Sequence, residues 1–134
     1  VCPDFAKQIA EIEHGLRPPF MSVGNLEARR DFCDVRDIVR AYHLAIEKCP
    51  AGIPMNIASG RAWSIQEVLD TLLQLSTVSI QVKKDPDRLR PADVSLMLGD
   101  ATRFRQHTGW QAEIDFHQTL ETVLNCWRHR VATS

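Results

Sequence analysis

Apolar residues recur every three or four positions in several stretches of the chain, and most of these stretches begin at a residue that commonly caps helices. The clearest begins at Ser64, where Glu67 completes a capping-box pair ahead of a stripe of isoleucine, valine and leucine. Asp34 and Asp115 stand in the same position before two other stretches. The pattern therefore predicts helices over residues 3–14, 34–49, 64–76, 100–107 and 115–131.

Short apolar runs lie between these helices, next to glycine, proline and asparagine. Residues 20–23 form a short apolar run and residues 53–58 are a second strand candidate, whereas residues 78–83 alternate between apolar and polar side chains as in a half-buried strand. A last short run follows at residues 94–98. Helices that alternate with short strands are typical of an α/β fold, so we expect one α/β domain over residues 1–134, with a small, largely parallel sheet and flanking helices.

The stretch from Gly24 to Ala45 sets a positive charge beside a helix. A glycine turn and the pair Arg29 and Arg30 precede the helix predicted from Asp34. Arginines beside the start of a helix favour an anion site. The apolar face of this helix, which we expect to be buried, carries Val35, Ile38, Val39, Tyr42, Ala45 and Cys49.

Charge and cysteine usage narrow the classes of partner. The 16 Lys and Arg residues are interspersed among 17 Asp and Glu residues, which gives no electrostatic footprint for nucleic acid or an anionic membrane. No apolar run approaches the ~20 residues of a membrane span. The four cysteines lack metal-ligand spacing, so we expect no metal site and four reduced thiols in a cytoplasmic protein. The chain begins at Val1 without an initiator methionine, which indicates a piece of a longer protein.

The familiar catalytic signatures are missing. The sequence contains no G-x-G-x-x-G, no Walker-type loop, no G-x-S-x-G and no H-E-x-x-H. Its five histidines are scattered over turns and the polar sides of predicted helices, where solvated side chains are the usual outcome. We therefore expect no catalytic residue in this chain.

Several phrases carry a resemblance to a known family. They are R-D-F-x-x-V-x-D-x-V from Arg30, R-P-x-D-V from Arg90 and T-G-W from Thr108. Together they resemble the carboxy-terminal substrate domain of extended short-chain dehydrogenases/reductases of the NAD-dependent epimerase/dehydratase family, which act on nucleotide sugars. The phrases A-K-Q-I-A-E-I-E, G-N-L-E-A-R-R-D-F and R-L-R-P-A-D-V-S-L-M-L-G-D resemble the branch of GDP-mannose 4,6-dehydratases and GDP-4-keto-6-deoxy-D-mannose reductases along nearly the whole chain.

This resemblance implies a division of labour between two domains. Such enzymes bind NADP through an amino-terminal Rossmann domain and react through a Tyr-x-x-x-Lys pair. Here the one tyrosine is Tyr42, and Ile46 stands four residues later, so the pair is not in this chain. The resemblance thus implies that the chain binds the GDP-sugar of an NADP-dependent GDP-4-keto-6-deoxy-D-mannose reductase. It would position the keto sugar for hydride transfer by the absent Rossmann domain.

The resemblance also assigns five residues to substrate binding. Arg30 and Arg90 are expected to bind the two phosphates, because a guanidinium stays charged and can bond phosphate oxygens in pairs. Asp93 would accept hydrogen bonds from ribose hydroxyls, and Asn25 and Phe32 would line the nucleoside side.

Spacing alone favours a plainer interpretation of the same residues. In that interpretation Arg30 pairs with Asp31 or Asp34, Arg90 pairs with Asp87, and the phenylalanine is simply part of the core.

Other functions remain open. Within the same family, the chain is alternatively the substrate domain of a GDP-mannose 4,6-dehydratase or of another nucleotide-sugar epimerase or dehydratase. Phe32 favours the reductase, since those dehydratases usually carry tryptophan after the Arg-Asp pair. From other classes, the chain is a free-standing, non-catalytic binding or interaction domain, or an unrelated α/β domain whose arginines form surface ion pairs. If a partner domain is missing, its absence uncovers an apolar face through which the chain is expected to form homo-oligomers.

Overall fold

The computed structural model describes residues 1–88 and 94–133. Within them the chain forms, in order, α1 (Cys2–Glu13), β1 (Phe20–Val23), β2 (Arg29–Asp31), α2 (Val35–Lys48), β3 (Ala62–Ser64), α3 (Ile65–Gln74), β4 (Gln81–Lys84), the 3-10 helix η1 (Pro86–Arg88), β5 (Leu96–Met97), α4 (Thr102–Thr108) and α5 (Phe116–Ala132). None of the helices described here has the length and apolar character needed to cross a membrane.

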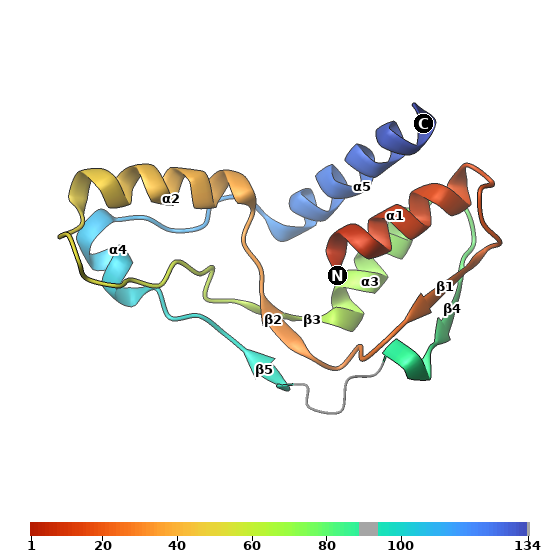
Figure 1. Ribbon diagram of the computed structural model, residues 1–134, viewed down its shortest axis with the longest axis horizontal. Coiled ribbons are helices and arrows are strands. Elements are labelled where there is room, and N and C mark those ends of the chain that lie inside the picture. Colours follow the sequence, from red (N-terminus) through yellow and green to blue (C-terminus); the bar gives the residue numbers. More distant parts are fainter. Residues whose placement is uncertain (89–93, 134) are drawn as a thin grey trace.

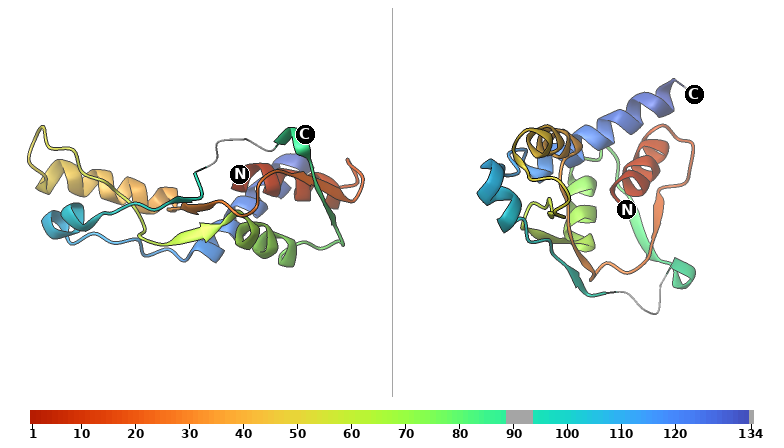
Figure 2. Two further views of the ribbon diagram at one scale, coloured as in Figure 1. Left: turned by 90° about the horizontal axis from the view of Figure 1, so that it is seen from below. Right: turned by 60° about the vertical axis from the view of Figure 1, so that its left-hand side comes forward.

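The elements gather at two ends of an elongated molecule. At one end α1, α3 and α5 lie together with β1 and β4, and at the other end α2 lies against α4 (Figure 1). The strands β2, β3 and β5 lie between the two ends. Figure 2 shows the same division from two further directions.

The larger core fills the end that holds α1, α3 and α5. Each of these helices turns the apolar stripe predicted from its sequence toward the other two. The buried side chains include Phe5, Ile9, Met21, Val23, Val68, Leu69, Leu72, Leu120 and Leu124. Burying one side chain of this size contributes about 1.5–3 kcal/mol, so these residues hold this end together.

The smaller core, at the other end, consists of three buried residues. They are Ala41, Phe104 and Trp110, and the two aromatic rings meet edge to face with centroids 5.7 Å apart. The indole Nε1 of Trp110 donates to the carbonyl of Asp37 at 3.1 Å. Gly109 ends α4 with a φ of 72°, a conformation that glycine adopts without strain, so T-G-W forms a turn that places the buried Trp110 directly after the helix.

The strands form two small sheets. β1 pairs with β4 in parallel, with Phe20 opposite Gln81. β2 is the central strand of the other sheet, antiparallel to β3 and parallel to β5. The expected α/β class with largely parallel pairing is confirmed, although the pairing is divided between two sheets. The strand predicted from residue 78 begins at Gln81, where its pairing with β1 begins.

The predicted helix caps are present. Asp34 Oδ1 accepts a hydrogen bond from the backbone in the first turn of α2 at 2.9 Å. Ser64 Oγ accepts from the backbone of Glu67 at 3.0 Å, and Glu67 Oε2 accepts in return from the backbone of Ser64 at 2.7 Å. Asp115 Oδ1 accepts from the first turn of α5 at 2.9 Å. These short-range signals therefore fix where three helices begin.

The face of α2 that was expected to be buried is buried only in part: Ala45 and Cys49 pack against the smaller core, whereas three other residues of this face are exposed. Val35 is 71% exposed, Val39 is 62% exposed and Tyr42 is 60% exposed. The fully buried residues of α2 are Asp37 and Ala41, which lie toward Trp110, so the buried side of the helix is rotated away from Val35, Val39 and Tyr42. The periodic pattern identified residues that share a face, but the described chain supplies no layer to cover the part of that face that holds Val35, Val39 and Tyr42.

The strand expected at residues 53–58 does not form in the described structure. This segment is extended and follows the loop after α2, but no strand lies beside it among the residues described. A strand needs a hydrogen-bonded neighbour, and β propensity does not supply one.

Stability should fall on acidification through an ion pair between the end of α1 and α5. The Glu13 carboxylate accepts hydrogen bonds from Nε and Nη2 of Arg128, both at 2.7 Å. The Glu13 side chain is only 6% exposed. The hydrogen bonds from Arg128 lower the pKa of Glu13 below its ordinary value. Because the folded pKa is lowered, this stabilisation is present above the unfolded pKa of about 4.3 and is lost as pH falls through the folded pKa.

We therefore expect the melting temperature to fall as pH is lowered from about 5 toward 2, and we expect Glu13→Gln to flatten that fall. Circular dichroism melts at several pH values would measure it, with the exposed Glu27→Gln as the matched control. An equally steep pH dependence in Glu13→Gln and in the control would show that the pair does not contribute.

Candidate functional site: a cleft between the first turn of α1 and β2

A cleft of about 660 Å³ opens between the first turn of α1 and the segment that contains β2. Separate parts of the chain form its walls: α1, the segment from the end of β1 to the residue after β2, the start of α3, and η1. The lining residues are Val1, Asp4, Phe5, Gly24, Asn25, Ala28, Arg30, Phe32, Ile65, Asp87 and Arg88. The volume lies within the ~300–1,000 Å³ typical of ligand pockets. Three of the five predicted site residues, Asn25, Arg30 and Phe32, are brought together here.

Arg30 is positioned by β2 and by its own hydrogen bonds. Its Nη1 donates to the carbonyl of Arg29 at 2.9 Å and to the carbonyl of Val94 at 2.7 Å. The two carboxylates that spacing alone would pair with it, Asp31 and Asp34, make hydrogen bonds to other groups. These contacts hold the guanidinium at the wall of the cleft.

Asp31 fixes the backbone between the two predicted site residues that flank it in sequence. Its carboxylate accepts from the backbone of Ser59 at 3.0 Å, from the backbone of Gly60 at 3.0 Å and from the backbone of Gly99 at 3.3 Å. The hydroxyl of Ser59 donates to it as well. One side chain thereby ties β2 to two loops, which sets the direction in which the neighbouring side chains leave the strand.

Phe32 belongs to the cleft and to the core at once. Its ring stacks on Phe116 with centroids 5.1 Å apart and planes 11° apart, and Phe116 in turn contacts Trp63 at 5.2 Å. The phenylalanine also lines the cleft. The two interpretations of this residue are therefore compatible, because packing against Phe116 fixes the orientation of the ring at the cleft wall.

The turn after β1 brings Gly24 and Asn25 to the cleft. The Oδ1 atom of Asn25 accepts from the backbone of Glu27 at 2.9 Å, which forms a local side-chain turn. A Cβ on Gly24 would lie 2.5 Å from the carbonyl oxygen of Arg88. Only glycine therefore allows η1 to approach this turn and close the cleft.

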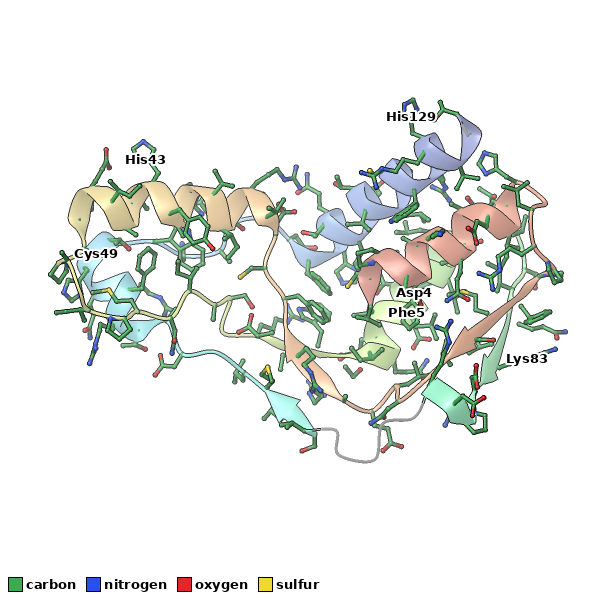
Figure 3. The ribbon with its side chains drawn as sticks, viewed as in Figure 1. Asp4, Phe5, His43, Cys49, Lys83 and His129 are labelled. Atoms are coloured by element: carbon green, nitrogen blue, oxygen red, sulfur yellow. The ribbon has the colours of Figure 1, made fainter. Side chains whose placement is uncertain are left out.

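Among the lining residues that were not predicted from the sequence, Asp4 and Arg88 form an ion pair. Asp4 Oδ2 accepts from Arg88 Nη1 at 3.2 Å and from Gln8 Nε2 at 3.0 Å. Asp4 lies beside Phe5 in the first turn of α1 (Figure 3). The phrase R-L-R-P already contained Arg88, two positions before Arg90, whereas Asp4 resembled an ordinary helix-starting acid.

Of the remaining expectations about the anion site, one is not tested by the described residues and the other is wrong. Arg90 and Asp93 lie outside the described residues. The start of α2, which was expected beside the anion, is capped by Asp34 and does not line the cleft. The first turn of α1 stands there instead.

The described cleft is suited to binding. Its described walls combine two arginines and two carboxylates with the aromatic rings of Phe5 and Phe32. The nearby Cys33 is no ready nucleophile, because burial, and then the carboxylates of Asp31 and Asp37, raise the pKa of its thiol to about 11. Residues 1–88 and 94–133 hold no group of three or more His, Cys, Asp or Glu side chains placed to bind a metal ion.

Comparisons with known proteins show the family of this chain. The family described as GDP-mannose 4,6 dehydratase matches residues 1–123. The GDP-6-deoxy-D-mannose reductase of Pseudomonas aeruginosa is 34% identical over 126 residues, which cover 94% of this chain and 41% of the relative. A GDP-mannose 4,6-dehydratase of Sinorhizobium fredii is 28% identical over 122 residues and is covered to 33%.

A solved structure shows the same fold. The structure of RMD from Pseudomonas aeruginosa, complexed with NADPH, superimposes with a TM-score of 0.89 and is 31% identical, covering 96% of this chain. The match takes in 42% of that longer protein. The chain thus spans between one third and about two fifths of the length of these relatives.

Proposed function

Because the chain belongs to the GDP-mannose 4,6 dehydratase family and corresponds to the carboxy-terminal part of an extended short-chain dehydrogenase/reductase, we propose that its cleft binds the nucleotide diphosphate of a GDP-sugar. The observation that carries the proposal is the meeting of Asn25, Arg30 and Phe32 in one cleft of about 660 Å³.

The chemistry of the cleft walls supports this ligand. The guanidinium of Arg30 can bond phosphate oxygens in pairs, and Arg88 stands on another wall of the same cleft. The charge of Arg88 is balanced by Asp4 at 3.2 Å. An incoming diphosphate would therefore compete with the Asp4 carboxylate for the Arg88 guanidinium. The ring of Phe32, held against Phe116, supplies a flat apolar surface for the nucleoside.

The finer proposal assigns the chain to a GDP-4-keto-6-deoxy-D-mannose reductase. The Pseudomonas aeruginosa relative is named as a GDP-6-deoxy-D-mannose reductase, and a similar structure holds NADPH. In that scheme NADPH supplies hydride from an amino-terminal Rossmann domain, for which this sequence contains no glycine-rich phosphate turn. The residues of this chain contribute binding energy from the GDP portion and keep the sugar in place.

A second candidate is a GDP-mannose 4,6-dehydratase, which the family match and the Sinorhizobium fredii relative favour. Both activities need the same GDP contacts, so the cleft serves either. Incubating the longer gene product with GDP-mannose would separate them, because only a dehydratase would form the 4-keto-6-deoxy sugar.

The test is a nuclear magnetic resonance titration of the 134-residue chain with GDP, UDP and inorganic phosphate. We expect saturable shifts of the Asn25, Arg30 and Phe32 amides with GDP, weaker ones with UDP, and no saturation with phosphate. The amides of α4, at the far end of the molecule, serve as internal controls. If GDP shifts the cleft amides no more than phosphate does, the cleft is not a nucleotide site.

A further inference from the structure

Arg88 lines the cleft between α1 and β2 together with Arg30, but it stands in a different charge environment. Its Nη1 donates to Asp4 Oδ2 at 3.2 Å, and its Nε lies 3.8 Å from Asp85 Oδ2. Asp87, the residue before it in η1, lines the cleft as well. The wall formed by η1 and the first turn of α1 therefore combines one guanidinium with an excess of carboxylates.

This environment disfavours a diphosphate at Arg88. A diphosphate would meet the carboxylates of Asp4 and Asp87, and it would have to displace Asp4 from the guanidinium. A neutral acceptor carries no such penalty, because Asp4 can keep its hydrogen bond. Among the residues described, Nη2 of Arg88 makes no hydrogen bond or ion pair, so the guanidinium has donors left for a ligand. Arg88 is therefore suited to a neutral, hydrogen-bond-accepting part of the nucleotide.

Two residues of α1 hold the guanidinium in place. Gln8 is only 2% exposed, and its Nε2 donates at 3.0 Å to Asp4 Oδ2, the same oxygen that accepts from Arg88. A buried side chain thus fixes the Asp4 carboxylate, and the carboxylate in turn fixes the position of Arg88. A planar guanidinium that is held in this way can recognise two acceptors at a defined spacing.

Arg88 lies next to the turn that is expected to line the nucleoside side of the cleft. That turn carries Gly24 and Asn25, and a Cβ on Gly24 would lie 2.5 Å from the carbonyl oxygen of Arg88. The turn therefore packs directly on η1. A nucleotide whose diphosphate is bound by Arg30 and whose nucleoside lies along Asn25 would bring its base to Arg88.

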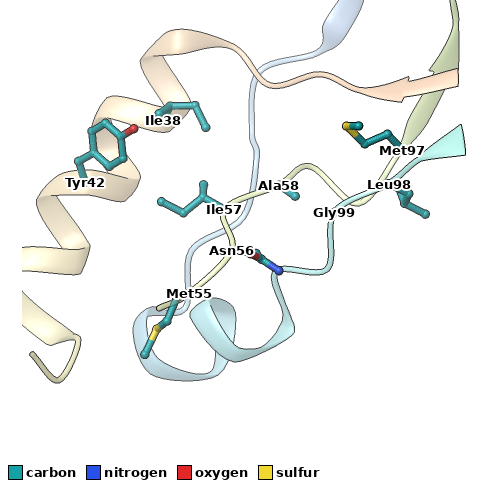
Figure 4. A pocket seen from close by; sticks show the side chains of 9 residues that line it. All are labelled: Ile38, Tyr42, Met55, Asn56, Ile57, Ala58, Met97, Leu98 and Gly99. Carbon is teal, nitrogen blue, oxygen red and sulfur yellow. The ribbon is translucent and has the colours of Figure 1, made fainter. Parts of the chain in front are cut away.

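A hollow at the other end of the molecule offers no comparable group. It has a volume of about 510 Å³ and lies between α2 and the segments 55–58 and 97–99 (Figure 4). Its described lining carries no charged side chain and consists of Ile38, Tyr42, Met55, Asn56, Ile57, Ala58, Met97, Leu98 and Gly99. The described walls of this hollow therefore provide no charge-assisted contact to a base.

Guanine presents a suitable pair of neutral acceptors. Its O6 and N7 lie side by side on one edge, and an arginine that donates to both is the commonest specific contact to this base. Adenine keeps N7 but carries an amino donor in place of O6. We propose that Arg88 donates hydrogen bonds to O6 and N7 of the guanine ring and so selects GDP-sugars, while Arg30 binds the diphosphate. This inference rests on the proposed function, because it needs the nucleotide in this cleft.

Calorimetric titration of the 134-residue chain with four diphosphates tests this assignment. They are GDP, inosine diphosphate, which lacks the 2-amino group but keeps O6 and N7, 7-deaza-GDP, which has carbon in place of N7, and ADP. We expect GDP and inosine diphosphate to bind within about threefold of each other, because both present the acceptor pair. We expect 7-deaza-GDP and ADP to bind roughly 5- to 150-fold more weakly, the usual discrimination of a paired contact to a base.

The variant Arg88→Ala should lose this discrimination, so that all four diphosphates bind it with similar Kd values. Arg17→Ala is the matched control, because Arg17 forms an ion pair of the same 3.2 Å length, with Glu11, and does not line the cleft. The control should leave all four Kd values unchanged. Thermal melts would identify a variant that fails to fold, and the comparison of GDP with 7-deaza-GDP on the unsubstituted chain does not depend on any variant.

Four results would overturn the proposal. An equal loss for all four diphosphates in Arg88→Ala would place this residue at the phosphates. Weak binding of inosine diphosphate, with 7-deaza-GDP binding as well as GDP, would assign recognition to a carboxylate that reads the 2-amino group. Equal binding of all four by the unsubstituted chain would exclude recognition of the base and leave the proposed diphosphate site intact. The absence of saturable binding for every one of them would overturn the proposed function as well.

Discussion

The purified 134-residue chain should oxidise no NADPH in the presence of a GDP-4-keto-6-deoxy sugar above the protein-free rate. The proton-transferring Tyr-x-x-x-Lys pair is not in this sequence, whose one tyrosine, Tyr42, is followed four residues later by Ile46. Tyr42 also lies on the exposed stripe of α2, not in the cleft that holds Arg30. General acid–base catalysis alone is typically worth about 10²–10⁴-fold, so the loss should be complete in practice.

The measurement is the decrease of NADPH absorbance, with the Pseudomonas aeruginosa reductase as positive control under the same conditions. Turnover by the pure chain that persists after repeated purification would contradict the assignment of a purely positioning role to these residues.

The second large effect concerns Arg30. Arg30→Ala should weaken GDP binding by about 2–4 kcal/mol, the usual cost of losing a desolvated, charge-assisted contact. This corresponds to roughly a 30- to 700-fold rise in Kd. Arg30→Lys should restore part of the loss, because an ammonium keeps the charge but cannot form the paired hydrogen bonds of a guanidinium.

Titration calorimetry with GDP would measure these constants. Arg103→Ala, at an exposed position on α4 outside the cleft, is the matched control. Because Arg30 also donates to the carbonyl of Val94, thermal melts must show that the variant retains its fold. A folded Arg30→Ala variant that binds GDP within twofold of the unsubstituted chain would remove this residue from the site.

Features that depend on near neighbours in sequence could be predicted. Ser64 and Glu67 satisfy each other's backbone within one turn, so the start of α3 could be placed before any tertiary contact was known. The same holds for Asp34 and Asp115. Likewise, Asn25, Arg30 and Phe32 lie within one short stretch around β2, and its local path delivers them to one cleft.

Features that depend on a partner distant in the sequence could not be predicted. The periodicity of α2 shows which residues share a face, but it does not show whether another layer of the fold covers that face. Val39, which was expected to be buried there, is 62% exposed. Residues 53–58 have strand character without a described neighbour to pair with. Arg88 reaches Asp4 across 84 positions, so no local pattern indicated that they would form part of the cleft.

The most direct test of the central claim is a crystal structure of this chain, alone or within its longer gene product, with bound GDP-mannose. We predict the diphosphate in the cleft between α1 and β2, with phosphate oxygens about 2.7–3.2 Å from the guanidinium nitrogens of Arg30 and the nucleoside against Phe32. A nucleotide bound elsewhere on the molecule, with this cleft empty at saturating ligand, would contradict the account.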